Sequence, residues 1–140
     1  MKKLKFIAIA IISLVAFSSC TEENPEEWYV ENFEILSENW ELIGRPDEVG
    51  SYYQYIFDKI PLNVSFHDGI ITAYLYLDNG VQTPLPYIES ALNSVNELYT
   101  LRFSYDIATD NTIAFKVHVN DDWTGRIRPG TERFRLAMIW

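Results

Sequence analysis

The chain has 140 residues and a formal net charge of −9 at neutral pH, which disfavours nucleic acid and other anionic surfaces as partners. It contains a single cysteine, so no disulfide can form within it. Hydrophobic residues make up 48% of the sequence and aromatic residues 15%, which is enough apolar material for a folded core.

The N-terminal residues have the architecture of a signal peptide. Three lysines (Lys2, Lys3 and Lys5) precede an apolar run over residues 6–17. As a helix this run would be about 18 Å long, which is too short to cross a hydrocarbon core of roughly 30 Å. The pattern predicts a targeting segment over residues 1–19 that is removed from the mature protein.

The residues around the expected cleavage point resemble the lipobox of bacterial lipoproteins. They read Ala16-Phe17-Ser18-Ser19-Cys20, with phenylalanine where that motif usually has leucine. The resemblance implies a diacylglycerol on the sulfur of Cys20, cleavage just before it, and acylation of the new amino group, for example with palmitate. Each buried CH₂ contributes about 0.8 kcal/mol, so two or three acyl chains would hold the protein at a membrane. The alternative is a secretory signal with a cysteine at its boundary by chance.

An acidic segment, residues 20–27, is expected to link this anchor to the folded part of the chain. Its four acids and one proline predict a solvated tether. Acidic residues at this place also resemble the surface-export signal of Bacteroidetes lipoproteins, although an ordinary spacer has the same composition. Thr21 stands where enterobacterial lipoproteins retained at the inner membrane have aspartate, so the resemblance implies the outer membrane. The expected mature chain keeps 11 − 3 = 8 basic residues and all 20 acids, a net charge of 8 − 20 = −12.

From Phe33 onward, the apolar residues recur with a period of two, which predicts strands. The expected strands lie within residues 33–35, 40–44, 51–57, 70–77, 81–88, 98–106, 113–119 and 134–140. The segment 81–88 contains Pro84 and Pro86, which cannot donate to a ladder, so it is expected to be an edge strand or a strand end. Asn79-Gly80 before it predicts a hairpin turn.

Three connecting segments have weaker patterns. Residues 61–68 predict a helical turn, residues 89–97 a loop or a weak helix, and residues 120–131 a long polar loop with Trp123. Seven to eight short strands with little helix indicate an all-β domain over residues 28–140. The expected fold is an antiparallel β-sandwich, immunoglobulin-like or similar, with a small β-barrel as the alternative.

The sequence from residue 33 to residue 140 resembles a group of small Bacteroidetes envelope lipoproteins. The likeness lies in the order and spacing of short motifs: Trp40, Tyr52-Tyr53, Pro61-Leu62 with Gly69, Tyr74 to Leu77, Thr83-Pro84-Leu85-Pro86-Tyr87, and Phe134-Arg135. It implies an all-β fold and an envelope location. The group has no established activity, so the resemblance implies no site residues.

Residues suited to catalysis or to metal binding are few. No Gly-x-Ser-x-Gly motif occurs, and two isolated histidines, His67 and His118, lack the spacing of zinc ligands. Oxygen ligands suited to calcium gather in one loop and near it: Asn120, Asp121 and Asp122, with Asp106 and Asp110. An Asx-rich turn without metal is the alternative, and no other cofactor is expected.

Two sets of residues are candidate binding surfaces. Four basic residues point away from the expected core positions of their strands: Arg102, Lys116, Arg133 and Arg135. If these strands are neighbours, they form a basic face for an anionic glycan or an acidic partner; the alternative is a solvated face with cross-strand pairs. Three tyrosines suggest an aromatic platform for a glycan: Tyr52, Tyr74 and Tyr76. Burial in the core is the stronger expectation for them, because aromatic side chains dominate cores.

These features together predict a non-catalytic lipoprotein of the outer membrane or cell surface that binds a glycan or another envelope protein. The membrane would be a partner through the lipid on Cys20, and nucleic acid would not be one. The competing hypothesis is a glycan-active or metal-assisted hydrolase of the cell envelope. A carboxylate-based hydrolase needs two carboxyl groups within about 10 Å of each other across a cleft.

Overall fold

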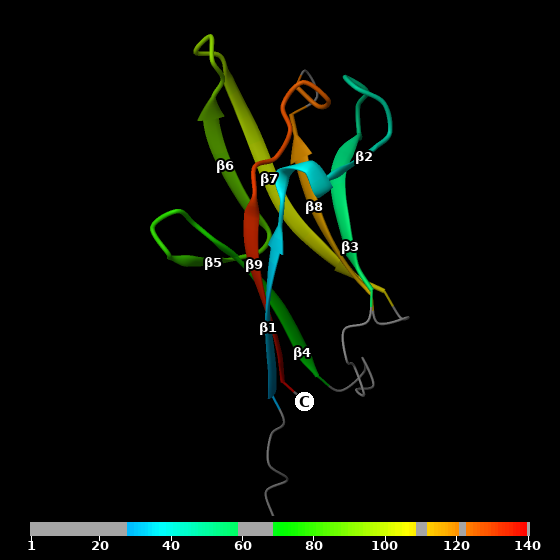
Figure 1. Ribbon diagram of the computed structural model, residues 1–140, viewed down its shortest axis with the longest axis vertical. Helices are drawn as coiled ribbons and strands as arrows, with labels where there is room; N and C mark the ends of the chain where they lie inside the picture. The colour runs from blue at the N-terminus through cyan, green and yellow to red at the C-terminus, as the bar shows by residue number, and fades with distance from the viewer. Residues whose placement is uncertain (1–27, 59–68, 109–111, 121–122, 140) are drawn as a thin grey trace, which may run out of the picture.

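The computed structural model describes residues 28–58, 69–108, 112–120 and 123–139 (Figure 1). The predicted signal peptide, the lipidation site Cys20, the acidic tether and the helical turn over residues 61–68 lie outside the described residues. Within the described ranges there is no helix with the length and apolar character that a transmembrane span requires.

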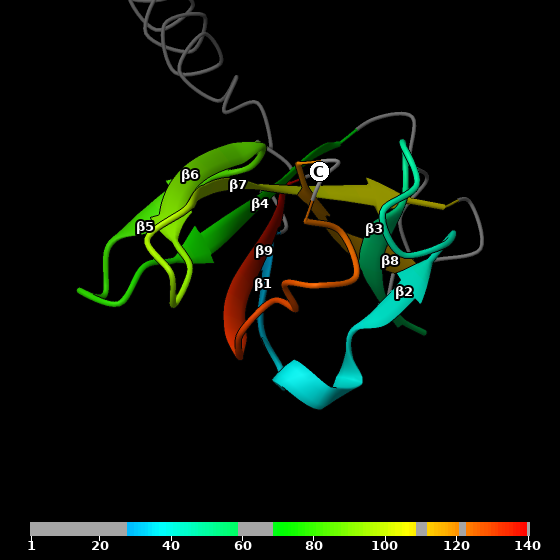
Figure 2. The same ribbon diagram turned by 90° about the horizontal axis from the view of Figure 1, so that it is seen from above.

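Nine strands, all antiparallel to their neighbours, form two sheets in the described part of the chain. The first sheet has four strands in the order β1 (Trp28–Ile35), β9 (Glu132–Ile139), β4 (Ile70–Tyr76) and β5 (Gln82–Pro84). The second has five strands in the order β2 (Glu41–Ile43), β3 (Tyr52–Phe57), β8 (Ile113–Val119), β7 (Leu98–Ile107) and β6 (Tyr87–Leu92). A short 3-10 turn, Ser37–Asn39, leads from β1 to β2 and so from one sheet to the other. Figure 2 shows both sheets from above.

The inner sides of the two sheets share one hydrophobic core. Every second residue of β8 and of β9 is buried: Ile113, Phe115, Val117, Val119, Phe134, Leu136 and Met138. The rings of Phe115 and Phe134 stack between the sheets with their centroids 4.2 Å apart. Two sheets packed face to face over one core form a β-sandwich, which confirms the predicted fold class. The barrel alternative is wrong, because no ladder joins the two sheets among the described strands.

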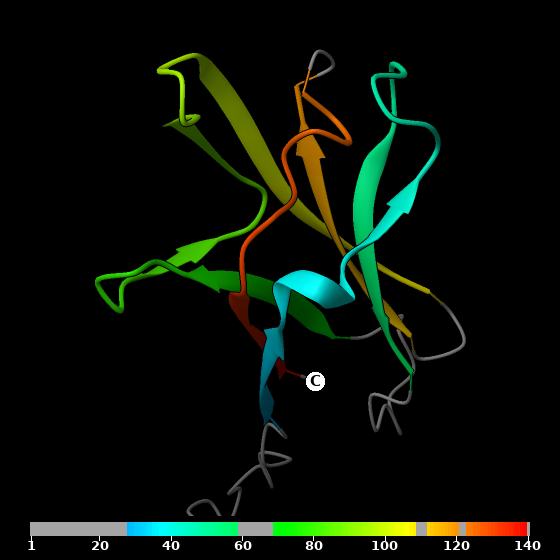
Figure 3. The same ribbon diagram turned by 45° about the horizontal axis from the view of Figure 1, so that its top comes forward.

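The segment expected as one returning strand over residues 81–88 divides between the two sheets. β5 pairs with β4, and the chain then crosses at Leu85-Pro86 to begin β6, which pairs with β7. The Leu85 side chain is buried at the crossing, and its backbone N–H donates to the carbonyl of Ala73 over 2.9 Å. Figure 3 shows this passage from β5 to β6. Both strands are sheet edges, as the prolines predicted.

The loop or weak helix expected over residues 89–97 is wrong in its first part, because β6 continues to Leu92. The strand pattern was hard to recognise because Glu89 stands at an inward position, between Tyr87 and Ala91. A turn follows, in which the Asn93 side chain accepts hydrogen bonds from two backbone N–H groups, both over 2.9 Å. This side-chain-capped turn explains the polar composition that suggested a loop.

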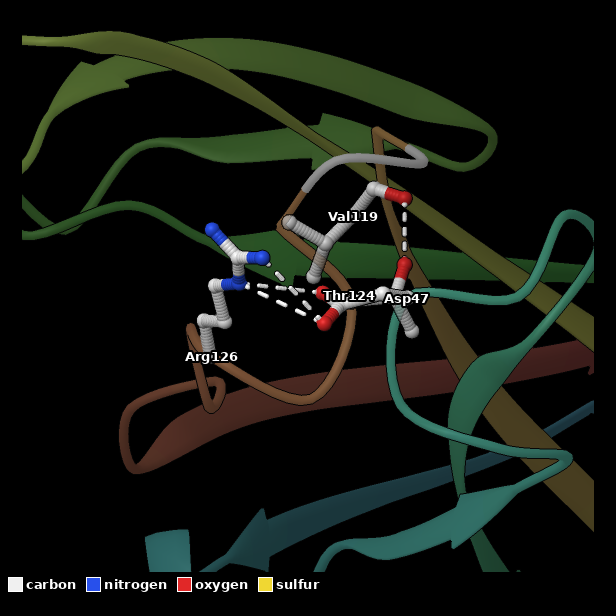
Figure 4. Close-up of polar contacts among 4 residues, drawn as sticks. All are labelled: Asp47, Val119, Thr124 and Arg126. Carbon is white, nitrogen blue, oxygen red and sulfur yellow. Dashed lines mark hydrogen bonds and ion pairs between the residues drawn. The ribbon is translucent and has the colours of Figure 1, made fainter.

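The polar loop after β8 is held against the loop between β2 and β3. The Thr124 side chain is fully buried, and its hydroxyl donates to the carbonyl of Val119 over 3.0 Å. The Thr124 carbonyl accepts the backbone N–H of Asp47 over 2.8 Å, and Arg126 forms an ion pair with the Asp47 carboxylate at 3.1 Å. Figure 4 shows the Thr124–Val119 hydrogen bond and the Arg126–Asp47 ion pair. The described part of this loop, from residue 123 onward, is therefore a packed element that closes one end of the sandwich.

Candidate binding face

The structure separates the four basic residues that the sequence grouped into one face. Arg133 and Arg135 belong to β9 of the four-stranded sheet, whereas Arg102 and Lys116 belong to β7 and β8 of the five-stranded sheet. All four point away from the core, and the outer sides of a sandwich face in opposite directions. The prediction of one four-residue basic face is therefore wrong. Alternation along a strand indicates which side a residue is on, but it does not indicate which sheet the strand joins.

The three tyrosines divide in the same way. Tyr74 and Tyr76 alternate along β4 with the buried Ala73 and Leu75, so they lie on the outer side of the four-stranded sheet and are half-buried there. Tyr52 lies on the outer side of β3 in the other sheet. The expectation of core burial is wrong for all three tyrosines, and their rings do not form one platform.

Strand register brings half of each set together on the four-stranded sheet. One row across the sheet runs through Asn32, Arg135, Tyr74 and Pro84. In the next row Glu34 lies opposite Arg133, and Tyr76 lies opposite Gln82. We call this surface the outer strip and define it by six residues: Asn32, Tyr74, Tyr76, Gln82, Arg133 and Arg135. The sequence signal for it was present, but it could be found only once β4 and β9 were known to be neighbours.

Hydrogen bonds position the side chains of the outer strip. The Tyr76 hydroxyl donates to the Asn32 side-chain oxygen over 3.0 Å, and an Arg135 guanidinium N–H donates to Gln82 Oε1 over 3.2 Å. A shallow groove of about 320 Å³ lies along the strip beside Tyr76 and Arg133, and the acid Glu34 also lines it. Neither arginine forms an ion pair with a described residue. Most guanidinium donors are thus available for a carboxylate, sulfate or phosphate group, next to two aromatic rings.

On the outer side of the five-stranded sheet, several polar and aromatic side chains contact one another. Lys116 forms a close ion pair with Asp106, and its ammonium nitrogen lies 5.1 Å from the centroid of the Tyr52 ring. The His118 ring also lies beside the Tyr52 ring, with 5.0 Å between the two ring centroids. Burial lowers the pKa of His118, and the positive charges of Arg102 and Lys116 lower it further, against a smaller opposing effect of Asp106. Lys116 is therefore engaged by Asp106 and Tyr52, whereas Arg102 forms no ion pair with a described residue and the buried His118 Nδ1 has no hydrogen-bond partner among them.

The calcium hypothesis receives no support from the residues that the structure describes. The Asn120 side-chain oxygen accepts the backbone N–H of Thr100 over 2.8 Å, and Asp106 is paired with Lys116. Asp110, Asp121, Asp122 and the histidine at position 67 lie outside the described residues. Among described residues, no three histidine, cysteine or acidic side chains gather in a way that suits a metal ion.

An acidic cavity that the sequence did not predict lies between the sheets, where β6 approaches the β4–β5 turn. It has a volume of about 340 Å³, and its lining includes three carboxylates, Asp78, Glu89 and Glu132. Burial raises the pKa of Glu132 to about 7, with further contributions from the charges of Glu89 and Asp78. Burial, and then the charge of Asp78, also raises the pKa of Glu89. The only signal in the sequence was an acid at an inward position of β6 and of β9.

Comparisons with protein-family models, with curated proteins and with solved structures give no match to this chain. The resemblance to Bacteroidetes envelope lipoproteins stays a prediction. The function is therefore proposed from the residues and their geometry.

Proposed function

We propose that this protein is a lipoprotein of the outer membrane or cell surface, whose β-sandwich binds a partner without catalysing a reaction. The proposed anchor is a lipid on Cys20, which follows a short apolar run and two serines. Only eight residues, 20–27, would then separate the lipid from the first strand. The sandwich would thus act close to the membrane surface.

The observation that supports a binding role is the outer strip. Two arginines without ion pairs to described residues stand beside two half-buried tyrosines, on a protein whose expected mature charge is 8 − 20 = −12. Unpaired arginines on an acidic molecule attract an anionic ligand locally, and the guanidinium fork matches a carboxylate or sulfate group. Tyrosine offers a flat apolar ring with a polar edge, which suits the face of a sugar. We infer that the ligand is an anionic glycan.

Binding of defined polysaccharides to the purified protein tests this inference. The probes are polygalacturonate, chondroitin sulfate and a neutral dextran, measured by titration calorimetry at low and moderate salt. The double variant Arg133→Gln/Arg135→Gln should weaken binding of the anionic probes at least about tenfold, because a hydrogen bond to a charged group contributes about 1.5–3 kcal/mol. Tyr74→Ala should also weaken it.

Arg102→Gln/Lys116→Gln is the matched control, since it also removes two positive charges, from the outer side of the other sheet. Equal losses for the two double variants would show non-specific charge attraction and contradict a site on the outer strip. Absence of binding to every anionic probe would contradict the glycan ligand. Mild crosslinking in whole cells would then test the other expected partner, an envelope protein.

The lipid anchor has a separate test. Substituting Cys20→Ser should leave an unprocessed precursor that incorporates no radiolabelled palmitate, because both processing and acylation depend on the thiol. The unsubstituted protein should incorporate the label and appear at its processed mass. A processed and acylated Cys20→Ser product would contradict the proposed anchor.

The competing function, a carboxylate-based glycan hydrolase, would use the acidic cavity. It is favoured by one observation, a Glu132 carboxyl whose pKa is raised to about 7 beside two further acids. Such a hydrolase needs one protonated and one ionised carboxyl group. The pKa of Glu89 is raised as well, which makes Glu89 less suited to be the ionised one. Release of reducing ends from the same polysaccharides, abolished by Glu132→Gln, would support this function over simple binding.

A further inference from the structure

An apolar patch lies on the outer side of the four-stranded sheet, at the end where the described chain begins. Trp28, Ile139 and Ile70 form one row across β1, β9 and β4, and their exposed fractions are 72%, 46% and 69%. Val30, Ala137 and Thr72 form the next row. A shallow groove of about 270 Å³ lies along β1 and β9 at this place. We call Trp28, Val30, Ile70, Ala137 and Ile139 the anchor-end patch.

The patch differs from ordinary scattered surface apolar residues in two ways. Its members are contiguous across three hydrogen-bonded strands, and neither row contains an acidic side chain although the protein is strongly acidic. The first of these residues is a tryptophan, the side chain most suited to the boundary between lipid headgroups and water. The patch therefore has the chemistry of a surface that meets a membrane interface.

The position of the predicted lipid on Cys20 indicates which membrane the patch would meet. Seven residues lie between Cys20 and Trp28, and eight residue steps of at most ~3.6 Å reach no further than about 29 Å. In Figure 1 the start of β1, the start of β4 and the C-terminal end of β9 lie together at the lower end, whereas the β6–β7 turn lies at the upper end. The anchored bilayer is thus held within reach of the patch, and such a short connection gives it a high effective concentration there.

We propose that the anchor-end patch rests in the headgroup region of the bilayer that holds the lipid on Cys20. This inference rests on the proposed lipid anchor and adds an orientation to it. The sandwich would lean on the membrane with the end of its four-stranded sheet, and the outer strip would begin one row further along the same face. The ligand would then be bound close to the membrane surface, with the β6–β7 turn directed away from it.

Single introduced cysteines test the proposal, because lipidation would occupy the only natural thiol. The full mature lipoprotein with Ile70→Cys, and separately with Ile139→Cys, is labelled with a nitroxide. It is then reconstituted into vesicles of phosphatidylethanolamine and phosphatidylglycerol. Leu98→Cys is the matched control, because Leu98 is an equally exposed apolar residue (64%) next to the β6–β7 turn. Accessibility of each label to oxygen and to a water-soluble nickel complex is measured by electron paramagnetic resonance.

The labels at positions 70 and 139 should be several-fold less accessible to the nickel complex than the label at position 98, and more accessible to oxygen. Equal accessibility at all three positions, in protein that sediments with the vesicles, would overturn the docking and leave the lipid anchor intact. Protein that does not sediment with the vesicles would overturn the lipid anchor, and the docking with it. The labels at positions 70 and 139 could also become less accessible to the nickel complex without vesicles, increasingly so at higher protein concentration. That result would show that a second copy of the chain covers the patch, and would overturn the membrane assignment.

Discussion

The outer faces of the two sheets hold similar residues in different states. Each face has two basic side chains and at least one tyrosine. On the five-stranded sheet, Lys116 is paired with Asp106 and lies over the Tyr52 ring. On the four-stranded sheet, Arg133 and Arg135 form no ion pair with a described residue. Arg102, the other basic residue on the five-stranded sheet, also forms no ion pair with a described residue, so the contrast between the two faces lies in Lys116 and its neighbours.

This difference follows from strand register. The pairing of β8 with β7 places Asp106 within reach of Lys116, two residues along β7 from the direct partner Ser104. β1 places Glu34 opposite Arg133 and Asn32 opposite Arg135, but the acid forms no ion pair there. A basic residue that is already in an ion pair must give up that contact to bind an anion, so it contributes only the difference between two contact free energies. An unpaired basic residue contributes the full free energy of the new contact.

The largest effect on stability is expected from a substitution in the core between the two sheets. Phe134 is fully buried on β9 and contacts rings of the other sheet, including Phe103 and the stacked Phe115. Phe134→Ala should lower the free energy of unfolding by about 3–5 kcal/mol, through lost burial and the cavity left behind. Denaturant unfolding measures it, with the outward-facing neighbour Arg133→Gln as control, expected within about 0.5 kcal/mol. A cost below about 1 kcal/mol for Phe134→Ala would contradict a core shared by both sheets.

The pH dependence of stability sharpens the contrast between the inward and outward sides of β9. The pKa of Glu132 is about 7 in the folded protein, whereas an unfolded chain has the ordinary value of 4.5. Between these values the folded state holds a proton that the unfolded state has lost, so the contribution of Glu132 to stability is greatest below pH 4.5 and is lost as the pH rises through 7. We expect Glu132→Gln to stabilise the protein by about 1 kcal/mol at pH 8, a value reduced because solvent partly screens this side chain.

Unfolding of Glu132→Gln and of the original protein at pH 4, 6 and 8 measures this contribution. The two should converge at pH 4 and separate as the pH rises. Parallel curves for Glu132→Gln and the original protein would contradict the raised pKa.

The sequence predicted the fold well because β-sandwich strands alternate between core and solvent. The alternation along β7, β8 and β9 identified the inward side of each strand, and the prolines at 84 and 86 identified edge strands. The crossing at Leu85 was missed because two short strands of different sheets follow one another without a turn signal between them. The strand β6 was missed because an acid occupies one of its inward positions.

The candidate site was predicted only in part, since its residues come from strands far apart in the sequence. Local alternation identified Arg133 and Arg135, whereas Tyr74 and Tyr76 were expected chiefly in the core. The pairing of β4 with β9 is a long-range contact that alternation does not encode. Asn32 and Gln82 were missed because short polar side chains on outward positions are common, and only their hydrogen bonds to the strip distinguish them. The acidic cavity depends on three separate segments and was missed for the same reason.

The smallest effect tests the comparison of the two faces most directly. Lys116→Gln should lower the free energy of unfolding by about 0.5–1 kcal/mol, because it removes a half-buried ion pair and a contact with an aromatic ring. A double-mutant cycle with Asp106→Asn isolates the ion pair, and its coupling energy should be about 0.5 kcal/mol at low salt. The corresponding cycle of Arg133→Gln with Glu34→Gln should give a coupling energy near zero, because those side chains lie opposite each other without an ion pair. Equal coupling energies in the two cycles would mean that both faces are satisfied internally, and the four-stranded sheet would lose its advantage as a binding surface.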